Sequence, residues 1–294
     1  MVELQVRRVL PTITCLVAAI GCAGRGSVGA DRSHVDGIAA NTAYEVHALH
    51  YGTLPQFPVA SLIAGADPAR RMDIALMVWL VRAPNRTVLV DAGFYREKFI
   101  TRWKPVDYVR PSAALERLGV PPEQVTDIIV SHVHWDHLDG ADLFPNARIW
   151  IQRAEYEHHI DSAGHPRRST IDSLDARMLA DLRGAGRVQL VEGDSVEIMP
   201  GIHVFTGGKH TFASQYATVS TASGTVVLAS DNAYLYENVS GRRPIAQTLD
   251  SLSNLAAQER MLRLAGDIRR IVPGHDPAVF TRFPEPGGGV ARIP

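Results

Sequence analysis

Four residues of types that commonly bind metal ions lie within six positions of one another. They are His132, His134, Asp136 and His137, in the run 131–137. In an extended segment alternate side chains point the same way, so the first two histidines can bind one ion together. The other two residues follow where the chain is expected to turn into a helix, so they can face a neighbouring ion. Imidazole and carboxylate ligands suit zinc and other borderline divalent metals.

Three further candidates come later in the chain, each shortly after a predicted strand. They are His210, Asp231 and His275, and small residues beside each let the backbone approach an ion closely. A surface histidine or a capping aspartate is common, so each of them alone would be read as structural. As a set that follows the first cluster, they predict the second half of a two-metal site.

Two divalent ions about 3.5–4 Å apart can share a hydroxide and keep it deprotonated near neutral pH. That hydroxide can attack an ester, lactone or amide carbonyl without any Ser or Cys nucleophile. One ion polarises the carbonyl oxygen and the other receives the alkoxide, while Asp136 can carry a proton to the leaving oxygen. The expected activity is therefore that of a metal-dependent hydrolase.

The histidine run must be held at the end of a strand, which is predicted at 126–131. Other strands are predicted at 74–81, 87–90, 147–151, 188–191, 202–205, 216–219, 225–228 and 271–272. Helices are predicted at 111–118, at 249–265, and within 153–185 around a loop at 164–166. Strands and helices do not alternate strictly, which favours a layered α+β fold over a doubly wound sheet. Residues 284–289, with their glycines and prolines, are predicted to form a loose tail.

These residues resemble the metallo-β-lactamase superfamily, and within it most of all the N-acyl-homoserine lactonases, which are quorum-quenching enzymes. The HxHxDH motif at 132–137 carries the likeness to the superfamily. The likeness to the lactonases rests on residues 152–156, 231–234 and 274–276. The resemblance spans roughly residues 44–280 and implies a single-domain αββα sandwich with the metals at one edge between two sheets.

The family pattern implies a role for each candidate ligand. The first metal would be held by His132, His134 and His210, the second by Asp136, His137 and His275, and Asp231 would bridge them. The resemblance also implies two divalent metal ions as cofactors, with Zn²⁺ as the expected metal.

The matching tyrosine of the lactonases hydrogen-bonds the substrate carbonyl, which gives that catalytic role to Tyr234, three residues after Asp231. Tyr236 is the nearby alternative, and a packed aromatic side chain is the structural reading of either. Asp91 is expected to orient a ligand histidine.

The chain departs from the family at the third histidine. Family members commonly have Thr-Pro-Gly-His there, whereas this chain has two glycines and Lys209 between Thr206 and His210. Among the other histidines, His158 and His159 are expected to face solvent on a charged helix. His47, His50 and His203 are expected to be structural, and the walls of the substrate pocket are expected at 51–72 and 153–170.

The beginning of the chain has the pattern of an export signal. Arg7 and Arg8 precede the apolar run 9–21, which is shorter than the roughly 20 residues of a membrane span. We predict a leader at 1–30 with cleavage after Ala30, a linker at 31–43 and the hydrolase domain at 44–294. In the alternative, a lipoprotein leader, Cys22 is lipidated. Either way the protein would be exported, to the periplasm or beyond.

Composition excludes several other classes of protein. The chain of 294 residues has a formal net charge of −1 and no basic stripe, which argues against nucleic acid as a partner. Both cysteines, Cys15 and Cys22, lie in the predicted leader, so β-lactamases with a thiolate ligand are excluded.

The expected function is opening of a lactone ring, an N-acyl-homoserine lactone by resemblance, with a small lactone or ester as the ligand. A glyoxalase II-like thioesterase, another ester hydrolase or a β-lactamase stays open as an alternative, as does a homodimer. A non-catalytic binding module on the same fold is disfavoured by the complete ligand set.

Overall fold

The computed structural model describes residues 43–294. The predicted leader at 1–30 and all but the last residue of the predicted linker lie outside the described residues. The described residues therefore include the whole of the predicted hydrolase domain.

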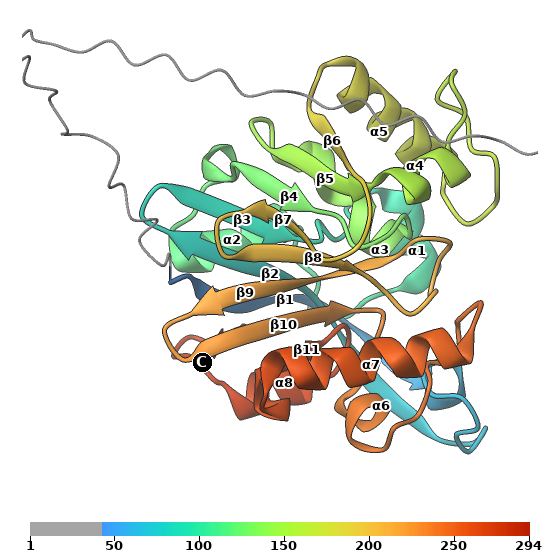
Figure 1. The fold of residues 1–294 in the computed structure, drawn as a ribbon, viewed down its shortest axis with the longest axis vertical. Coiled ribbons are helices and arrows are strands. Elements are labelled where there is room, and N and C mark those ends of the chain that lie inside the picture. The colour runs from blue at the N-terminus through green and yellow to red at the C-terminus, as the bar shows by residue number, and fades with distance from the viewer. Residues whose placement is uncertain (1–42) are drawn as a thin grey trace, which may run out of the picture. The chain divides into compact units, whose positions relative to one another are not determined.

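Two β-sheets pack face to face at the centre of this domain (Figure 1). The larger sheet has the strand order β12-β1-β2-β3-β4-β5-β6, and the smaller one has the order β11-β10-β9-β8-β7. The strands of the larger sheet are β1 Glu45–Pro58, β2 Arg71–Ala83, β3 Arg86–Val90, β4 Asp127–Ile129, β5 Arg148–Gln152, β6 Val188–Val191 and β12 Val290–Ile293. Those of the smaller sheet are β7 Val196–Met199, β8 Ile202–Thr206, β9 Gln215–Thr221, β10 Gly224–Ser230 and β11 Ile271–Pro273.

The continuous apolar run in β2 is typical of a strand whose two faces are both buried. Alternate side chains of a strand point to opposite faces, so a strand buried on both sides reads as a continuous apolar run. Leu76, Val78 and Leu80 join the core beneath the helices. Met77, Trp79 and Val81 join the core between the two sheets.

Helices cover the outer faces of both sheets, which completes the four layers. Against the larger sheet lie α1 Glu97–Trp103, α2 Pro111–Leu115, α3 Trp135–Leu138, α4 Arg153–His159 and α5 Ser173–Gly184. The remaining helices are α6 Tyr236–Ser240, α7 Ser251–Ala265 and α8 Ala278–Arg282. Figure 1 shows α7 along the smaller sheet, where Ala257 and Met261 pack against side chains of β8 to β11. The predicted single-domain αββα sandwich is confirmed.

The prediction of a loose tail at 284–289 was wrong. Gly287, Gly288 and Gly289 all have positive φ angles and turn the chain back on itself. Residues 290–293 then form β12, which pairs with β1 in antiparallel register, from Val46 opposite Ile293 to Leu49 opposite Val290. The sequence gives no local sign of this pairing because its partner strand lies more than 240 residues away.

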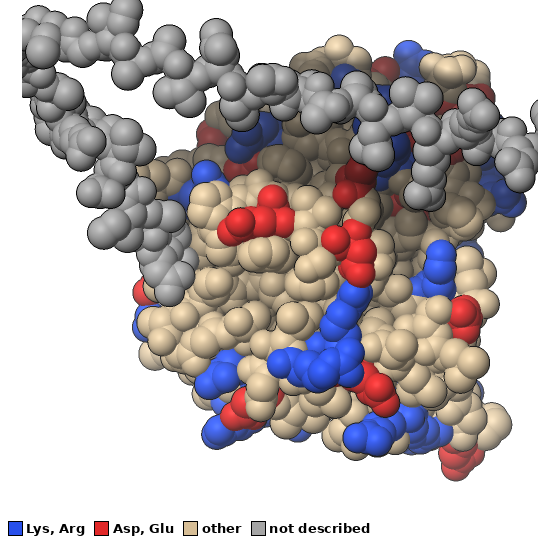
Figure 2. Space-filling view, viewed as in Figure 1, with Lys and Arg blue, Asp and Glu red and all other residues tan. Residues whose placement is uncertain are grey.

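Two surface features bear on partners. None of the described helices has the length and apolar character needed to cross a membrane. On the face drawn in Figure 2, Lys and Arg side chains are interspersed with Asp and Glu side chains on a mostly uncharged surface. This mixture differs from the one-signed surface expected of a nucleic-acid interface.

Candidate metal centre

All seven predicted ligands meet at one edge of the sandwich, just beyond the carboxyl ends of strands. The loop after β4 supplies His132 and His134, and α3 supplies Asp136 and His137. The other three ligands come from the loop after β8 and from the ends of β10 and β11. They form two groups of potential ligands, His132, His134, His210 and Asp231 in one, and Asp136, His137 and His275 in the other.

The first group converges on His134. Its Nδ1 lies 2.9 Å from Nε2 of His132 and 2.9 Å from Nε2 of His210. Oδ2 of Asp231 lies 3.6 Å from Nε2 of His132 and 3.2 Å from Nε2 of His210. Three imidazole nitrogens and one carboxylate oxygen therefore face a common point.

The second group is built around the other oxygen of Asp231. Its Oδ1 lies 3.3 Å from Nε2 of His137 and 3.0 Å from Nε2 of His275. Oδ2 of Asp136 lies 3.6 Å from Nε2 of His137 and 3.7 Å from Nε2 of His275. The two oxygens of Asp231 thus serve different groups, which is the arrangement a bridging carboxylate requires.

In His210 and His275, the ring nitrogen that points away from the site, Nδ1, is hydrogen-bonded to a backbone carbonyl. Nδ1 of His210 lies 2.8 Å from the Gln247 carbonyl oxygen, and Nδ1 of His275 lies 2.9 Å from that of Ala75. A carbonyl oxygen only accepts, so each Nδ1 carries the hydrogen and each Nε2 presents a lone pair to the site.

Two buried polar atoms at the centre, Nε2 of His137 and Oδ1 of Asp231, have no hydrogen-bond partner among the described residues. Buried polar groups in proteins are nearly always satisfied, so this pair points to a ligand that belongs between them. A divalent cation accepts electron pairs from both. The residues present therefore fit a dinuclear metal site.

The same burial and crowding shift the pKa values of these groups. Burial lowers the pKa of His132 well below its ordinary value, and neighbouring histidines lower it further. Burial opposes ionisation of Asp231, but the charges of His137 and His275 hold its pKa well below the usual range. Asp231 and Asp136 in turn raise the pKa of His137 despite its burial. Metal ions must displace protons held by this cluster, so their affinity falls as the pH is lowered.

A cavity of about 150 Å³ opens onto the two ligand groups. Its polar wall includes Asp136, Asp231, Tyr234 and His275. Its apolar wall is formed by Leu54, Phe57, Leu62, Ile74, Trp103 and Trp135. The prediction that residues 51–72 form part of the cavity wall is confirmed. Residues 153–170 line other hollows instead, and Trp103 of α1 completes the wall of this cavity.

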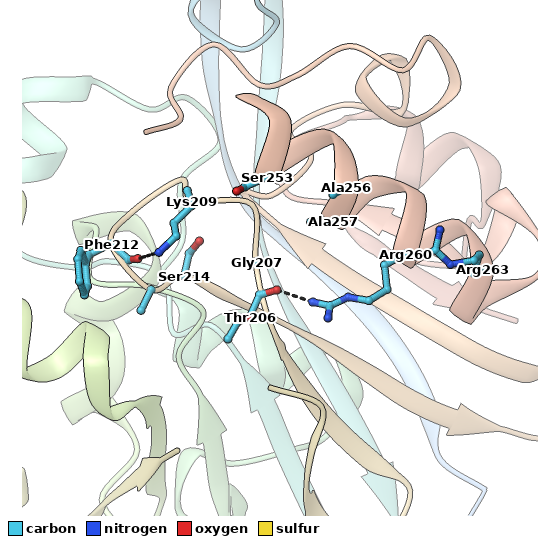
Figure 3. A pocket seen from close by; sticks show the side chains of 11 residues that line it. Thr206, Gly207, Lys209, Phe212, Ser214, Ser253, Ala256, Ala257, Arg260 and Arg263 are labelled. Atoms are coloured by element: carbon cyan, nitrogen blue, oxygen red, sulfur yellow. Dashed lines mark hydrogen bonds between the residues drawn. The ribbon is translucent and has the colours of Figure 1, made fainter. Parts of the chain in front are cut away.

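The lysine that departs from the family pattern does not enter this cavity. Lys209 has a positive φ of 59°, and its Nζ donates to the Phe212 carbonyl at 3.0 Å. Figure 3 shows it in a separate hollow between the β8–β9 loop and α7, where Arg260 reaches the Thr206 carbonyl. A side chain at Gly208 would collide with Asn254, so glycine there permits close packing beneath the ligand loop.

Among the histidines given no ligand role, the prediction for His159 was wrong. It is 2% exposed, and its Nδ1 lies 2.9 Å from the Glu155 carbonyl. Residues four apart share a helix face, and this face of α4 packs inward. His158 is half-buried and stacks on Phe212 at 3.8 Å between ring centres.

Sequence reasoning gave no role to Glu155, which is fully buried beside the site. Its carboxylate accepts hydrogen bonds from the backbone N–H of Val133 at 3.3 Å and of Ala213 at 2.7 Å. It therefore ties the loop of His132 to the loop of His210. No local signal in the sequence marks this role, because a charged helix does not show which of its faces packs inward.

A family model described as the metallo-β-lactamase superfamily matches residues 76–275, which is more than half of the chain. The chain belongs to this superfamily. The match begins in β2 and ends at the predicted ligand His275, so it contains all seven candidate ligands.

Several proteins similar to this chain are N-acyl homoserine lactonases. An N-acyl homoserine lactonase of a Bacillus species is 28% identical over 232 residues, covering 74% of this chain and 87% of that protein. The structure of an N-acyl homoserine lactone hydrolase with N-hexanoyl-L-homoserine at its catalytic metal centre matches with a TM-score of 0.68. It is 23% identical and covers 83% of this chain and 99% of that chain.

The dizinc quorum-quenching lactonase AidC matches with a TM-score of 0.62 at 17% identity, covering 86% of this chain and 95% of that chain. At such low identity the structural matches show a shared fold. This member of the superfamily is therefore a lactonase-like hydrolase with His and Asp groups for a dinuclear metal site.

Proposed function

We propose that this protein is a zinc-dependent lactonase that opens the ring of N-acyl homoserine lactones. The observation that carries the proposal is Asp231, whose two oxygens face two separate groups of ligands beside the hydroxyl-bearing Tyr234. The lactonase relatives support the substrate class. The nitrogen and oxygen ligand set, with no thiolate among the described residues, supports zinc.

The reaction adds water across the ester bond of the ring, so that the C–O bond breaks and a hydroxy acid forms. Divalent ions held by these ligands would polarise the carbonyl and lower the pKa of the attacking water. Asp136 has 14% of its side chain exposed and lies in the cavity wall, where its carboxylate can accept a proton from that water. It can then return the proton to the departing alkoxide oxygen.

Tyr234 would donate a hydrogen bond to the carbonyl oxygen. Burial raises the pKa of its hydroxyl well above the ordinary value, so the hydroxyl keeps its proton. It lies 3.3 Å from Nδ1 of His210, but that nitrogen already donates to the Gln247 carbonyl. The hydroxyl hydrogen is therefore free to point into the cavity, where negative charge develops on the carbonyl oxygen.

The apolar wall of the cavity favours a lactone with an apolar substituent. Leu54, Leu62 and Ile74 are all buried, and Phe57 packs against the same core. A substituent laid along this wall removes apolar surface from water, at roughly 25 cal/mol per Å². An acyl chain on the homoserine nitrogen has this character.

A panel of substrates given to zinc-loaded protein tests the proposal. It should contain N-hexanoyl homoserine lactone, a simple γ-lactone, a glutathione thioester, a cephalosporin and a phosphodiester. We expect the highest kcat/KM for the acyl homoserine lactone. Faster cleavage of the thioester, the cephalosporin or the phosphodiester would overturn the assigned reaction.

A further inference from the structure

A second hollow, of about 490 Å³, lies beside the metal cavity and shares one of its walls. Trp135 lines both, because its indole stacks on Phe99 and Trp103 of α1, which line one hollow each. The second hollow is bounded by the end of α1 on one side and by residues 166–173 on the other. It contains none of the predicted metal ligands, so the proposed chemistry does not account for it.

Three arginines line this second hollow: Arg102, Arg167 and Arg168. Within residues 43–294, neither Arg102 nor Arg168 makes an ion pair. The side chain of Arg167 donates only through Nε, to the Ile160 carbonyl at 3.2 Å, so the two outer nitrogens of its guanidinium have no partner among residues 43–294. Like charges gathered without ion-pair partners repel one another, so an anion among them would lower the electrostatic energy.

The single carboxylate in the wall does not neutralise these arginines. Asp172 pairs with Lys98 and accepts from the backbone N–H of Leu174 at 2.9 Å as the cap of α5. The hydroxyl-bearing Ser169 and Thr170 line the same hollow and add hydrogen-bond donors. The lining is therefore cationic and rich in donors, which matches a carboxylate or a phosphate group.

A layer of aromatic rings joins the two hollows. Trp103 faces the metal cavity and stacks on Trp135 at 5.2 Å between ring centres, while Phe99 faces the second hollow and stacks on Trp135 at 5.1 Å. The Arg102 guanidinium lies 5.4 Å from the ring centre of Trp103. An apolar chain leaving the metal cavity along these rings would meet the arginines next.

We propose that the arginine-lined hollow is a second substrate subsite, which binds an anionic group at the far end of the substrate's acyl chain. The inference rests on the proposed lactonase function and narrows its substrate class. The preferred substrate carries a lactone at one end, an apolar chain against the tryptophans, and a carboxylate or phosphate at the other end.

Paired substrates test this subsite directly. Homoserine lactones whose acyl chains end in a carboxylate are compared with the methyl esters of the same chains, over lengths of about four to twelve carbons. We expect KM for the carboxylate to be about tenfold lower than for its ester at one preferred length, as expected for exposed charge-assisted contacts. Added salt should reduce the difference because it screens exposed charges.

A variant with R102A, R167A and R168A should lose this preference while keeping its kcat/KM for the neutral ester. The matched control replaces Arg153, Arg177 and Arg269 by alanine, since these exposed arginines are paired with acids and lie outside the hollow. The control should keep the preference despite an equal loss of charge. An equal ratio of KM values in the wild type and the first variant would overturn the subsite.

Binding of inorganic phosphate, measured by calorimetry, needs no turnover and separates this inference from the proposed function. Binding that is present in the wild type and the control but lost in R102A/R167A/R168A supports the anion site even if no lactone is hydrolysed. Binding that persists in that variant belongs to the metal centre, and together with an unchanged KM ratio it contradicts the inference.

Discussion

Nδ1 of His137 lies 2.8 Å from Oδ2 of Asp91, and Asp91 is completely buried. The same carboxylate accepts hydrogen bonds from the backbone N–H and the hydroxyl of Ser131 and from the hydroxyl of Ser230, at 2.8–2.9 Å. A carboxylate oxygen only accepts, so Nδ1 of His137 carries the hydrogen and Nε2 faces the metal site. One side chain at the end of β3 thus fixes a ligand ring and joins the ends of β4 and β10. This arrangement accords with the role expected for Asp91 as the residue that orients a ligand histidine.

Replacing Asp91 by Asn should weaken metal binding without removing any ligand. The amide offers one acceptor oxygen in place of two, so some donors around it lose their partner and the His137 ring is less firmly oriented. Loss of such an outer contact typically costs 10–100-fold in metal affinity. Competition with a chromophoric chelator measures this, and D181N, at an exposed aspartate of α5, is the control. Unchanged zinc affinity in a folded D91N protein would contradict the positioning role.

Replacing Asp231 by Asn should reduce the metal content itself. Asp231 is the one ligand whose two oxygens face both groups, so its loss would remove the negative charge that offsets the mutual repulsion of two neighbouring cations. We expect close to two zinc ions per chain in the wild type and one or fewer in D231N, by elemental analysis. His165→Ala is the control, since His165 lies exposed in a loop. Equal metal content in D231N and wild type would exclude a bridging role.

The sequence indicated which candidate ligands would come together, because they follow predicted strands that end at one edge of the sandwich. The spacing of His132, His134, Asp136 and His137 is a motif in itself, and the structure brings them together with the three later candidates. Their role as ligands stays a prediction until metal is measured. The layered fold followed from the same strands, since apolar runs such as 74–81 mark strands buried on both faces.

Other features were missed because they depend on contacts between distant segments. The burial of His159 follows from how α4 packs against the ligand loops, and a charged helix carries no local sign of that contact. The pairing of β12 with β1 joins the two ends of the domain. The arginine-lined hollow requires α1 and residues 166–173 to meet across Trp135, which no periodicity in the sequence indicates.

The stability of the fold should depend on pH through Asp175. Its buried carboxylate lies 2.7 Å from the Arg96 guanidinium, which also pairs with Asp139. The other carboxylate oxygen of Asp175, Oδ2, has no hydrogen-bond partner among the described residues. Burial and the neighbouring Asp139 raise the pKa of Asp175 to about 9. In the unfolded chain the pKa of an aspartate carboxyl is about 3.9. Between these values the folded state binds more protons, so the free energy of unfolding falls as the pH rises from about 4 to 9.

Asp175→Asn cannot ionise and resembles the protonated carboxyl, so it should become more stable than the wild type as the pH rises. We expect the smallest difference in Tm at pH 5. Toward pH 9 the Tm of D175N should exceed that of the wild type by a growing margin, as the free energy of unfolding of the wild type falls by up to about 1.4 kcal/mol per pH unit. Thermal unfolding across this range measures the difference. D181N, on the same helix but exposed, should keep the wild-type slope, and parallel curves for D175N and wild type would contradict the assigned pKa.

We propose that the protein is exported, and the prediction concerns residues outside the described part of the chain. Arg7 and Arg8 followed by the apolar run 9–21 predict cleavage after Ala30 or lipidation at Cys22. Intact mass of protein from the native host should correspond to a chain that begins at Asp31 or at a lipidated Cys22. C22S separates the two routes, because it blocks only the second. Recovery of the full-length chain from the cytosol would count against export.

Replacing Tyr234 by Phe should slow lactone opening while leaving the metal centre intact. The ring keeps its packing beside His210 and His275, at 5.6 and 5.9 Å between ring centres, and only the hydroxyl is removed. A single donor to a developing oxyanion is commonly worth about 10²–10³ in kcat. We expect a smaller loss, of about tenfold or slightly more, because the metals would polarise the same carbonyl. KM should change little if the hydrogen bond forms mainly in the transition state.

Y236F is the matched control for this substitution. Tyr236 is also buried and lies two residues further along, but its ring packs beneath Arg282, away from the metal cavity. Steady-state kinetics and zinc analysis on both variants give the comparison. A selective fall in kcat for Y234F with two zinc ions retained supports the catalytic role. Full activity in Y234F, or equal losses in both variants, would remove Tyr234 from the reaction and leave its hydroxyl as a packing feature beside His210.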